Sequence, residues 1–573
     1  MKILKEFYTQ RIKRGLVRRL NNLKIARMAK FVSHHSPPAS GAPVVFFKAS
    51  TGIDDLSWNS GFHLLASWAL RLKGIPVVYF ACHSGMSKCV LGTNRDNPHK
   101  EMPCKSCIYQ SKTLYTGVPS NVEGQTSQVE WFDYRRDSQL AKAIENLSLP
   151  ELMNFEWSLK EQPVIASSKG AKQTPNESGI ASSQRTLLAM TVPLGALCLP
   201  GLRWILRIHH LSDDEPTRYI LREYILSAWN VAQKFSRFLD EANPRAVIVF
   251  NGQFYPEATA RYIAQKRGIR GITHEVGLQP ASAFFTDGQA TAYPIHIPDE
   301  FELNDQQNAR LDAYLAKRFQ GDFTMAGIKF WSDMKGLDES FLQKAAGFKQ
   351  IVPIFTNVIF DTSQPHANTV FEDMFDWLDL TLEIIRAHPE TLFVIRAHPD
   401  ELRVRKSSRE TVAGWVASHG VDKEPNVVFV SPNESLSSYE LIQRSKFVMV
   451  YNSTIGLEAS IMGAAVLCAG KARFTQYPTV FFPQTAAEVR GRTEEFLDAE
   501  RIEVPADFKR NARRFLYYQL FRTSLPFGEF LEPSVRTTQT RLRSFELDEL
   551  LSSEAVKVIL EGVLEDGDFL LKE

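Results

Sequence analysis

Short apolar runs alternate with longer amphipathic segments in the first part of the chain. Val44–Lys48 is apolar throughout and predicts a strand, and Trp58–Leu72 repeats apolar residues at helical spacing. Ile75–Phe80, which follows Gly74, predicts a second strand. This strand-helix-strand order predicts a parallel, doubly wound sheet, because parallel strands need a crossover connection.

The same rhythm returns twice further along the chain. Ala246–Phe250 and Ile269–Thr273 predict strands on either side of a helix at Glu257–Arg267. A second α/β unit follows, with strands expected at Ile351–Phe360, Leu392–Ile395, Val427–Val430, Phe447–Val450 and Ala465–Cys468. The fold class is therefore α/β with two Rossmann-like domains.

The pattern also divides the chain. We expect a basic amphipathic helix and linker over residues 1–42, a first Rossmann-like domain over 43–340, and a second over 341–507. Only helical patterns remain over 508–573. Residues 119–184 lose the periodicity and end in a stretch rich in Ser, Lys, Gly and Asn, which predicts a mobile insertion.

Composition narrows the class of protein. The 573 residues are 44% hydrophobic and 23% charged, which excludes a disordered, collagen-like or coiled-coil chain. Six cysteines and the lack of a secretory signal pattern favour the reducing cytoplasm. The long apolar stretch Leu187–Leu206 contains proline, glycine and arginine, so we expect a buried or surface-packed segment rather than a membrane span.

Charge is concentrated at the amino terminus. Residues 1–30 hold ten Lys and Arg and one acidic residue, Glu6, which leaves 57 basic against 64 acidic residues elsewhere. Apolar residues recur at helical spacing within this segment, at Leu4, Tyr8, Ile12, Leu16, Leu20 and Leu23. Such a helix either lies on an anionic membrane surface, at the inner membrane, or covers the domain behind it. Nucleic acid is not an expected partner, because the remaining chain is acidic.

One motif follows the predicted strand Leu392–Ile395. Arg396 and His398 come directly after it, and Pro399 fixes the turn. In open α/β sheets ligands bind outside the carboxyl ends of the strands. Arg396 and His398 are therefore candidates to hold a phosphate through charge-assisted hydrogen bonds, although a His-Pro pair alone is also common in plain loops.

A second motif lies about fifty residues further on. The strand Phe447–Val450 leads into a turn with Asn452, Ser453 and Thr454, and a helix opens at Gly456. Free N–H groups at a helix start, with two hydroxyls beside them, form an anion site, although hydroxyl residues also cap helices. Glu458 lies in the first turn, where it could accept hydrogen bonds from ribose. Together the two motifs predict a nucleotide site, and no P-loop pattern is present.

These residues resemble a known family. Ile351–Asp361, Arg396-Ala397-His398-Pro399 and Tyr451–Glu458 with Gly463 are similar to the carboxyl-terminal half of bacterial capsule polysaccharide biosynthesis proteins. That family includes Kdo transferases that use CMP-linked donors. The resemblance implies the GT-B fold, in which two Rossmann-like domains face a cleft and the second one binds the nucleotide sugar.

The resemblance also implies roles for the motif residues. Arg396 and His398 would face the donor phosphate from one wall and Ser453 and Thr454 from the other, while Glu458 would hold the ribose. Asn452 and Gly456 belong to the same turn and helix start. Transfer of this type requires no metal cofactor when a helix dipole, His and Arg offset the charge of the leaving group.

An inverting transfer also needs a group that takes the proton of the acceptor hydroxyl. Candidates at strand ends of the first domain are Glu275, His274 and Asp54, with Asp55 beside it. Residues of these types are equally common as helix caps or as members of ion pairs in loops. We rank Glu275 first.

Four of the six cysteines fall within 26 positions, at Cys82, Cys89, Cys104 and Cys107. Cys-x2-Cys is a common half of a structural zinc site, but the other pair is spaced irregularly. Zinc ligands and reduced, packed thiols are thus both compatible with the spacing.

The sequence therefore predicts a glycosyltransferase that moves a sugar, such as a CMP-linked acidic sugar, from a nucleotide donor to a surface or capsule polysaccharide acceptor. Three alternatives stay open. They are a teichoic-acid-like glycerophosphotransferase, a nucleotide-sugar epimerase, and a non-catalytic nucleotide-sugar-binding subunit of a capsule assembly complex.

Overall fold

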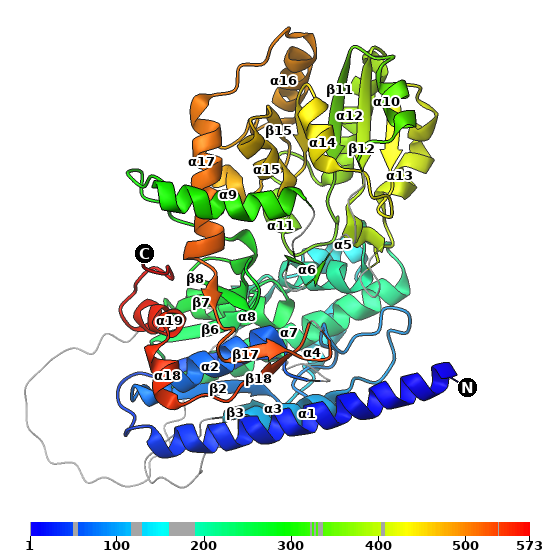
Figure 1. Ribbon diagram of the computed structural model, residues 1–573. Coiled ribbons are helices and arrows are strands. Elements are labelled where there is room, and N and C mark those ends of the chain that lie inside the picture. The colour runs from blue at the N-terminus through cyan, green and yellow to red at the C-terminus, as the bar shows by residue number, and fades with distance from the viewer. Residues whose placement is uncertain are drawn as a thin grey trace, which may run out of the picture.

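The chain forms two α/β domains, with the amino-terminal domain in the lower half of Figure 1 and the carboxyl-terminal domain in the upper half. The computed structural model describes residues 2–49, 55–115, 129–159, 190–320, 324–325, 328–329, 336–402, 407–536 and 538–573.

The amino-terminal domain is built on a seven-stranded sheet with the order β16-β8-β7-β6-β1-β2-β3. Its parallel strands are β1 (Val44–Lys48), β2 (Val77–Cys82), β3 (Val129–Phe132), β6 (Ala246–Phe250) and β7 (Arg270–Val276). Two antiparallel strands extend one edge, β8 (Ser282–Thr286) and β16 (Leu525–Pro526). The predicted parallel sheet is confirmed.

Both faces of this sheet are covered by helices. Along β1, Val44 and Phe46 are buried on one face and Val45 and Phe47 on the other. The first face packs against α1 (Lys2–His35), α2 (Trp58–Leu72), α3 (Cys104–Tyr115), α18 (Leu547–Ser552) and α19 (Glu554–Leu564). The second packs against α4 (Ser138–Ile144), α5 (Leu149–Met153), α6 (Leu194–Leu206), α7 (Glu215–Ala242) and α8 (Tyr255–Lys266).

The carboxyl-terminal domain holds a five-stranded parallel sheet with the order β13-β12-β11-β14-β15. The strands are β11 (Gln350–Phe355), β12 (Thr391–Arg396), β13 (Val427–Val430), β14 (Val448–Val450) and β15 (Val466–Cys468). One face packs against α9 (Asp305–Phe319), α10 (Glu339–Ala345), α14 (Ser438–Arg444), α15 (Ile455–Met462) and α17 (Ala506–Tyr517). The other packs against α12 (Met374–Ala387), α13 (Val412–His419) and α16 (Ala486–Asp498).

The end of the chain returns to the first domain. After α17 the chain runs down to the amino-terminal domain and adds β16 to its sheet (Figure 1). A hairpin of β17 (Leu531–Pro533) and β18 (Thr540–Leu542) follows. The expectation of helices alone over 508–573 is therefore wrong at these strands. Runs of two or three residues are too short to show a period-two pattern.

The expected insertion at 119–184 is also partly ordered. It contains β3, α4, α5 and β4 (Trp157–Leu159), which pairs with β5 (Met190–Val192). Local caps set the helix starts, since Asp137 accepts hydrogen bonds from two N–H groups of α4 and Ser148 with Glu151 forms a capping box on α5. Residues 119–128 and 160–184 of the expected insertion lie outside the described residues.

In the apolar stretch Leu187–Leu206, residues 187–189 lie outside the described residues, Met190–Val192 forms β5, and Leu194–Leu206 forms α6. This helix contains Pro200 and buries Leu194, Cys198 and Leu202 against the sheet. Within the described ranges, no helix has both the length and the apolar character that a membrane crossing requires.

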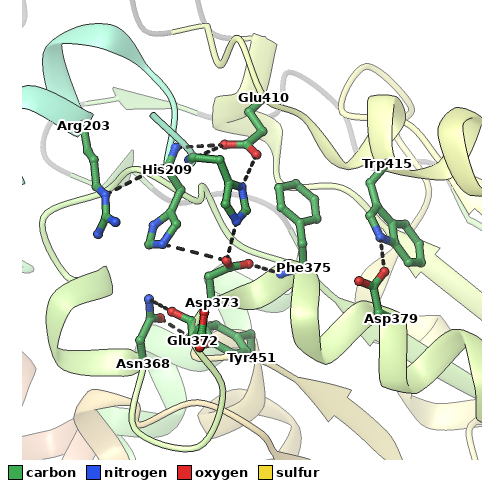
Figure 2. Close-up of polar contacts among 11 residues, drawn as sticks. Arg203, His209, Asn368, Glu372, Asp373, Phe375, Asp379, Glu410, Trp415 and Tyr451 are labelled. Carbon is green, nitrogen blue, oxygen red and sulfur yellow. Dashed lines mark hydrogen bonds and ion pairs between the residues drawn. The ribbon is translucent and has the colours of Figure 1, made fainter. Parts of the chain in front are cut away.

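A polar contact joins the two domains beside the cleft. Figure 2 shows the segment after α6 meeting Asp373, which caps α12, and Glu410. His210 Nε2 lies 2.8 Å from Asp373 Oδ2, and its Nδ1 lies 2.5 Å from Glu410 Oε1. Burial lowers the pKa of the His210 imidazole, but the two carboxylates outweigh burial and raise it above 6.5. Both ring nitrogens face acceptors, which favours the imidazolium form.

The raised pKa of His210 predicts a pH-dependent contribution to stability. A histidine whose folded pKa is raised stabilises the fold fully below its unfolded pKa, and this contribution is lost as pH rises through the folded pKa. We expect His210→Gln to lower the melting temperature at pH 6 more than at pH 9. The control His34→Gln removes an exposed imidazole and should leave the melting temperature unchanged at both pH 6 and pH 9. An equal loss for His210→Gln at both pH values would contradict this assignment.

Candidate functional site

A pocket of about 500 Å³ opens between the two domains. The amino-terminal domain contributes Trp204 of α6 and three residues after β8, Thr291, Ala292 and Pro294. The other lining residues come from the carboxyl-terminal domain, and they follow four strands of its parallel sheet. After β11 they are Asn357, Val358, Phe360, Asp361, Ser363, Gln364 and His366; after β12, His398 and Asp400; after β14, Asn452–Thr454; after β15, Lys471–Phe474 and Gln476.

His398 faces this pocket as a hydrogen-bond donor. The backbone N–H of Asp400 donates to His398 Nδ1 at 3.1 Å, so the ring proton of the neutral form sits on Nε2. Burial lowers the pKa of His398, and the nearby Arg396 adds to this effect against the two carboxylates of Asp361 and Asp400. A neutral imidazole with one free N–H is suited to bind an anionic oxygen.

The start of α15 forms the next part of the wall. Thr454 is the cap residue of this helix, but its side chain makes no capping hydrogen bond. Ser453 and Thr454, which both carry hydroxyl groups, line the pocket at this helix start, and the N–H groups of Gly456 and Leu457 donate to their carbonyls at 3.0 and 3.1 Å. Asn452 lines the same pocket, and its Oδ1 is buried with no partner among the described residues. Capping alone does not explain these hydroxyls.

Two cations that the motifs did not include complete this part of the pocket. Lys471 and Arg473 follow β15 and line the pocket, and the Arg473 guanidinium lies 3.8 Å from the ring centroid of Tyr293. Burial, together with the nearby charges of Arg261, Lys471 and Arg473, lowers the pKa of His366 to about 4. Positive charge therefore converges around a neutral His366, as it does in a site for an anion.

Arg396 does not face the pocket. It is 5% exposed, and its guanidinium donates to the carbonyl of Leu436, so it holds the segment before α14. Burial lowers its pKa to about 10. Arg396 is therefore not among the residues that line the pocket, because its side chain at the end of β12 is directed to the segment before α14.

Glu458 has a structural role instead of the expected ribose contact. Its Oε1 lies 2.6 Å from Arg318 Nε of α9, and its Oε2 accepts a hydrogen bond of 2.5 Å from the Tyr439 hydroxyl. Glu458 is 3% exposed and lies on a face of α15 that packs against α9 and α14. The carboxylate is therefore already satisfied away from the pocket.

Gly456 also serves packing rather than the ligand. A Cβ at this position would lie 2.9 Å from Val450 Cγ2 and 3.2 Å from Phe474 Cζ. The glycine lets α15 approach β14 closely, and it does not line the pocket.

Glu275, the first-ranked candidate base, lies near the end of β7 and is not among the residues that line the pocket. It accepts hydrogen bonds from Asn251 Nδ2 at 2.8 Å, Asn59 Nδ2 at 3.1 Å and the Val276 N–H at 2.9 Å. Burial raises the pKa of this carboxyl, while the three donors and Arg473 hold it down in part. Because Arg473 lines the pocket, Glu275 is electrostatically coupled to the opposite wall.

The other candidate bases differ in position. His274 is fully buried on the opposite face of β7, its ring 4.2 Å from that of His63, and burial keeps its pKa well below 6.5. It is therefore not placed to meet a substrate. Asp54 lies outside the described residues. Asp55 accepts hydrogen bonds from Asn21 of α1 and from Ser534, which gives it a structural role.

The four clustered cysteines line one small pocket, together with Met86 and Met102. Burial raises the pKa of Cys82 above its usual range and that of Cys89 to about 12, so these thiols stay protonated at neutral pH. Across the described part of the chain, no three His, Cys, Asp or Glu side chains are arranged to hold a metal ion. Of the two interpretations left open by the spacing, this arrangement favours reduced, packed thiols, and a structural zinc stays a prediction.

Comparison with known proteins identifies the carboxyl-terminal domain. Residues 336–488 match the family described as "Capsule polysaccharide biosynthesis protein". The expected family is confirmed for this segment. The match spans β11 to β15 and therefore includes every strand end that lines the pocket from this domain.

Longer similarities extend beyond this segment. The curated protein FixF of Sinorhizobium fredii is 31% identical over 306 residues, which cover 53% of this chain and 65% of that protein. The chain thus spans about two thirds of the length of this relative.

Among solved structures, a β-Kdo 2,4 transferase, KpsC of Thermosulfurimonas dismutans, aligns at 11% identity with a TM-score of 0.33, over 54% of this chain and 88% of that one. A UDP-GlcNAc 2-epimerase of Neisseria meningitidis aligns at 13% identity with a TM-score of 0.23, over 50% and 76% of the two chains. At these scores neither structure assigns an activity to this chain.

The position of Glu458 leads to a stability prediction. Removing one partner of a buried ion pair leaves the other charge unpaired, which costs about 3–5 kcal/mol. Glu458→Ala should therefore lower the free energy of unfolding by about this amount in urea titrations. Glu495→Ala, which breaks an exposed pair with Arg492, should cost about 0–1 kcal/mol. Equal, small losses for both variants would contradict the structural role of Glu458.

Proposed function

We propose that this chain is a glycosyltransferase that transfers a sugar from a nucleotide-activated donor to a surface or capsule polysaccharide acceptor. The observation that carries the proposal is the pocket between the domains. There the Nε2 side of His398, the hydroxyl-bearing residues Ser453 and Thr454 at the start of α15, and the cations after β15 line one space. These groups are complementary to a phosphate that becomes a leaving group.

The charge distribution supports a donor that carries a second anionic group. The neutral imidazole of His398 and the amino-terminal end of α15 together form the proposed phosphate site. Lys471 and Arg473 supply further positive charge nearer the amino-terminal domain, beside Thr291 and Tyr293. A CMP-linked acidic sugar has this arrangement, a phosphate joined to a sugar that bears a carboxylate.

The proposed transfer is a direct displacement. Glu275 accepts the proton of an acceptor hydroxyl, and the hydroxyl oxygen forms a bond to the anomeric carbon of the donor sugar. The bond between this carbon and the phosphate oxygen breaks, and its electron pair leaves with the phosphate. Lys471, Arg473 and the N–H groups of α15 offset the developing charge. In this proposal the chain's own groups carry out the step without a metal cofactor.

The first test is a panel of nucleotide sugars with a capsule-type acceptor, with and without EDTA. A CMP-linked donor should release CMP as the sugar joins the acceptor, and EDTA should leave the rate unchanged. An epimerase would change the sugar without releasing nucleotide, and a glycerophosphotransferase would release CMP only from CDP-glycerol. Donor binding without release of nucleotide would indicate a non-catalytic subunit and would contradict the proposal.

His398→Ala tests the phosphate contact. A hydrogen bond to a charged group contributes about 1.5–3 kcal/mol, so donor affinity should fall about 10- to 100-fold in isothermal titration calorimetry. His419→Ala removes an exposed histidine from the same domain and should bind the donor as the wild type does. Unchanged affinity in His398→Ala would refute its assigned contact.

Glu275→Gln tests the base, because a carboxamide of the same shape accepts no proton at neutral pH. Transfer should be lost while donor affinity is kept. Asp361→Asn, which changes a carboxylate on the donor side of the pocket, is the matched comparison. If Glu275→Gln keeps the transfer activity and Asp361→Asn loses it, the base is Asp361 of the carboxyl-terminal domain and not Glu275.

The hydrogen bonds of Glu275 also predict the pH profile. The raised pKa means that the rate falls as pH drops through a value above 4.5, where the carboxylate becomes protonated. Asn251→Ala removes a hydrogen-bond donor that stabilises the Glu275 carboxylate, so the pKa of Glu275 rises. The acidic limb of the pH–rate profile should then move upward by about one pH unit or more. A limb that stays in place in the kcat/KM profile would show that another group titrates.

A further inference from the structure

The helix α1 has two apolar faces, and only one of them packs on the protein. The packed face contains Asn21, Asn22, Ile25, Ala29 and Val32, which are all buried. From residue 12 onward, where the side chains are described, the outer face contains the exposed large apolar residues Ile12 (59% exposed), Leu16 (57%), Leu20 (58%), Leu23 (51%) and Phe31 (40%). We call these five residues the outer stripe.

Helical geometry places the outer stripe opposite the packed face. Residues nine positions apart are separated by two and a half turns, because each residue turns the helix by about 100°. Leu16 is nine positions from Ile25, Leu20 from Ala29, and Leu23 from Val32. The apolar spacing seen in the sequence therefore belongs to the exposed side of the helix, and covering the domain does not explain it.

The helix is fixed to the domain in this orientation. Asn22 and Gln110 of α3 exchange two amide hydrogen bonds of 3.1 and 3.0 Å. Asn21 accepts a 2.9 Å hydrogen bond from the N–H of Leu542, and Lys24 donates to the Leu542 carbonyl at 3.2 Å. These hydrogen bonds fix the middle of α1 to the domain, and the helix lies along the lower edge of the molecule in Figure 1. The outer stripe is thus presented on a rigid, straight support.

Exposed cations accompany the outer stripe. Lys13, Arg19, Arg27 and Lys30 are exposed on the same helix. In the sequence of α1 the one acidic residue is Glu6. An apolar stripe beside cations matches an anionic bilayer surface, where the apolar side chains enter the acyl boundary and the cations meet the lipid phosphates. A second copy of the helix would instead bring like charges together.

We propose that α1 docks this chain on an anionic phospholipid surface through the outer stripe and these four cations. The helix lies in the plane of the interface and does not cross it. This inference is independent of the proposed transfer reaction, because it concerns a different surface and is tested without donor or acceptor.

The test is sedimentation of the full-length protein with two kinds of vesicle. One contains phosphatidylcholine alone, and the other contains phosphatidylcholine with about 30 mol% of the anionic lipid phosphatidylglycerol. Wild type should bind the anionic vesicles and bind the neutral ones far more weakly, and added salt should reduce binding. Arg19→Gln/Arg27→Gln/Lys30→Gln should weaken binding about 100-fold, since each cation near the surface contributes about fivefold.

Two further variants separate apolar insertion from charge. Leu16→Gln/Leu20→Gln/Leu23→Gln keeps every charge and should also lose binding, with an unchanged melting temperature because these residues are exposed. Lys317→Gln/Lys423→Gln/Lys509→Gln removes the same charge from exposed positions of the rest of the molecule and should bind as wild type.

Three results would overturn the proposal. The first is equal binding of wild type and the leucine variant, and the second is equal weakening by the control lysine variant, which would indicate general charge attraction. The third is a concentration-dependent dimer without lipid that the leucine variant abolishes, because the outer stripe would then be a contact between two copies.

Discussion

The cleft depends on the parallel arrangement of the carboxyl-terminal sheet. Because β11, β12, β14 and β15 run in the same direction, their carboxyl ends meet at one edge, and the chain leaves each strand at the same side. His398, Thr454 and Lys471 come from segments far apart in sequence, and this geometry brings them to one pocket. The amino-terminal domain closes the pocket with Thr291 and the residues beside it.

Burial then divides the polar groups into two kinds. Arg396 and Glu458 are buried and have hydrogen-bond partners within the protein, Leu436 for Arg396 and Arg318 with Tyr439 for Glu458. The groups on the pocket side keep donors that the protein does not use, such as the hydroxyl of Thr454. A buried group with its partners supplied stabilises the fold, whereas a group facing the pocket with free donors is suited to bind a ligand.

Much of the fold could be predicted from the sequence. β1, β6 and β13 begin and end where the apolar runs do, because buried parallel strands read as continuous apolar stretches between turn residues. The strands β16 to β18 could not be predicted, since so few residues show no period. The ordered elements β3, α4 and α5 could not be predicted, because their apolar positions are sparse and the two helices depend on local caps.

The candidate site was predicted in part. His398, Asn452, Ser453 and Thr454 line the pocket as expected, since the rule that ligands lie beyond strand ends applies to them directly. The same rule applied to β15 would have indicated Lys471 and Arg473. Arg396 and Glu458 could not be placed from sequence, because the direction of a side chain at a strand end or on a helix face depends on tertiary packing.

The central claim is that the pocket binds a phosphate between His398 and the start of α15. A crystal structure of the protein soaked with CMP tests this most directly. The account predicts phosphate density within hydrogen-bond distance of His398 Nε2 and of the N–H groups or hydroxyls of Ser453 and Thr454. Nucleotide density elsewhere on the molecule, with this edge of the sheet left unoccupied, would contradict it.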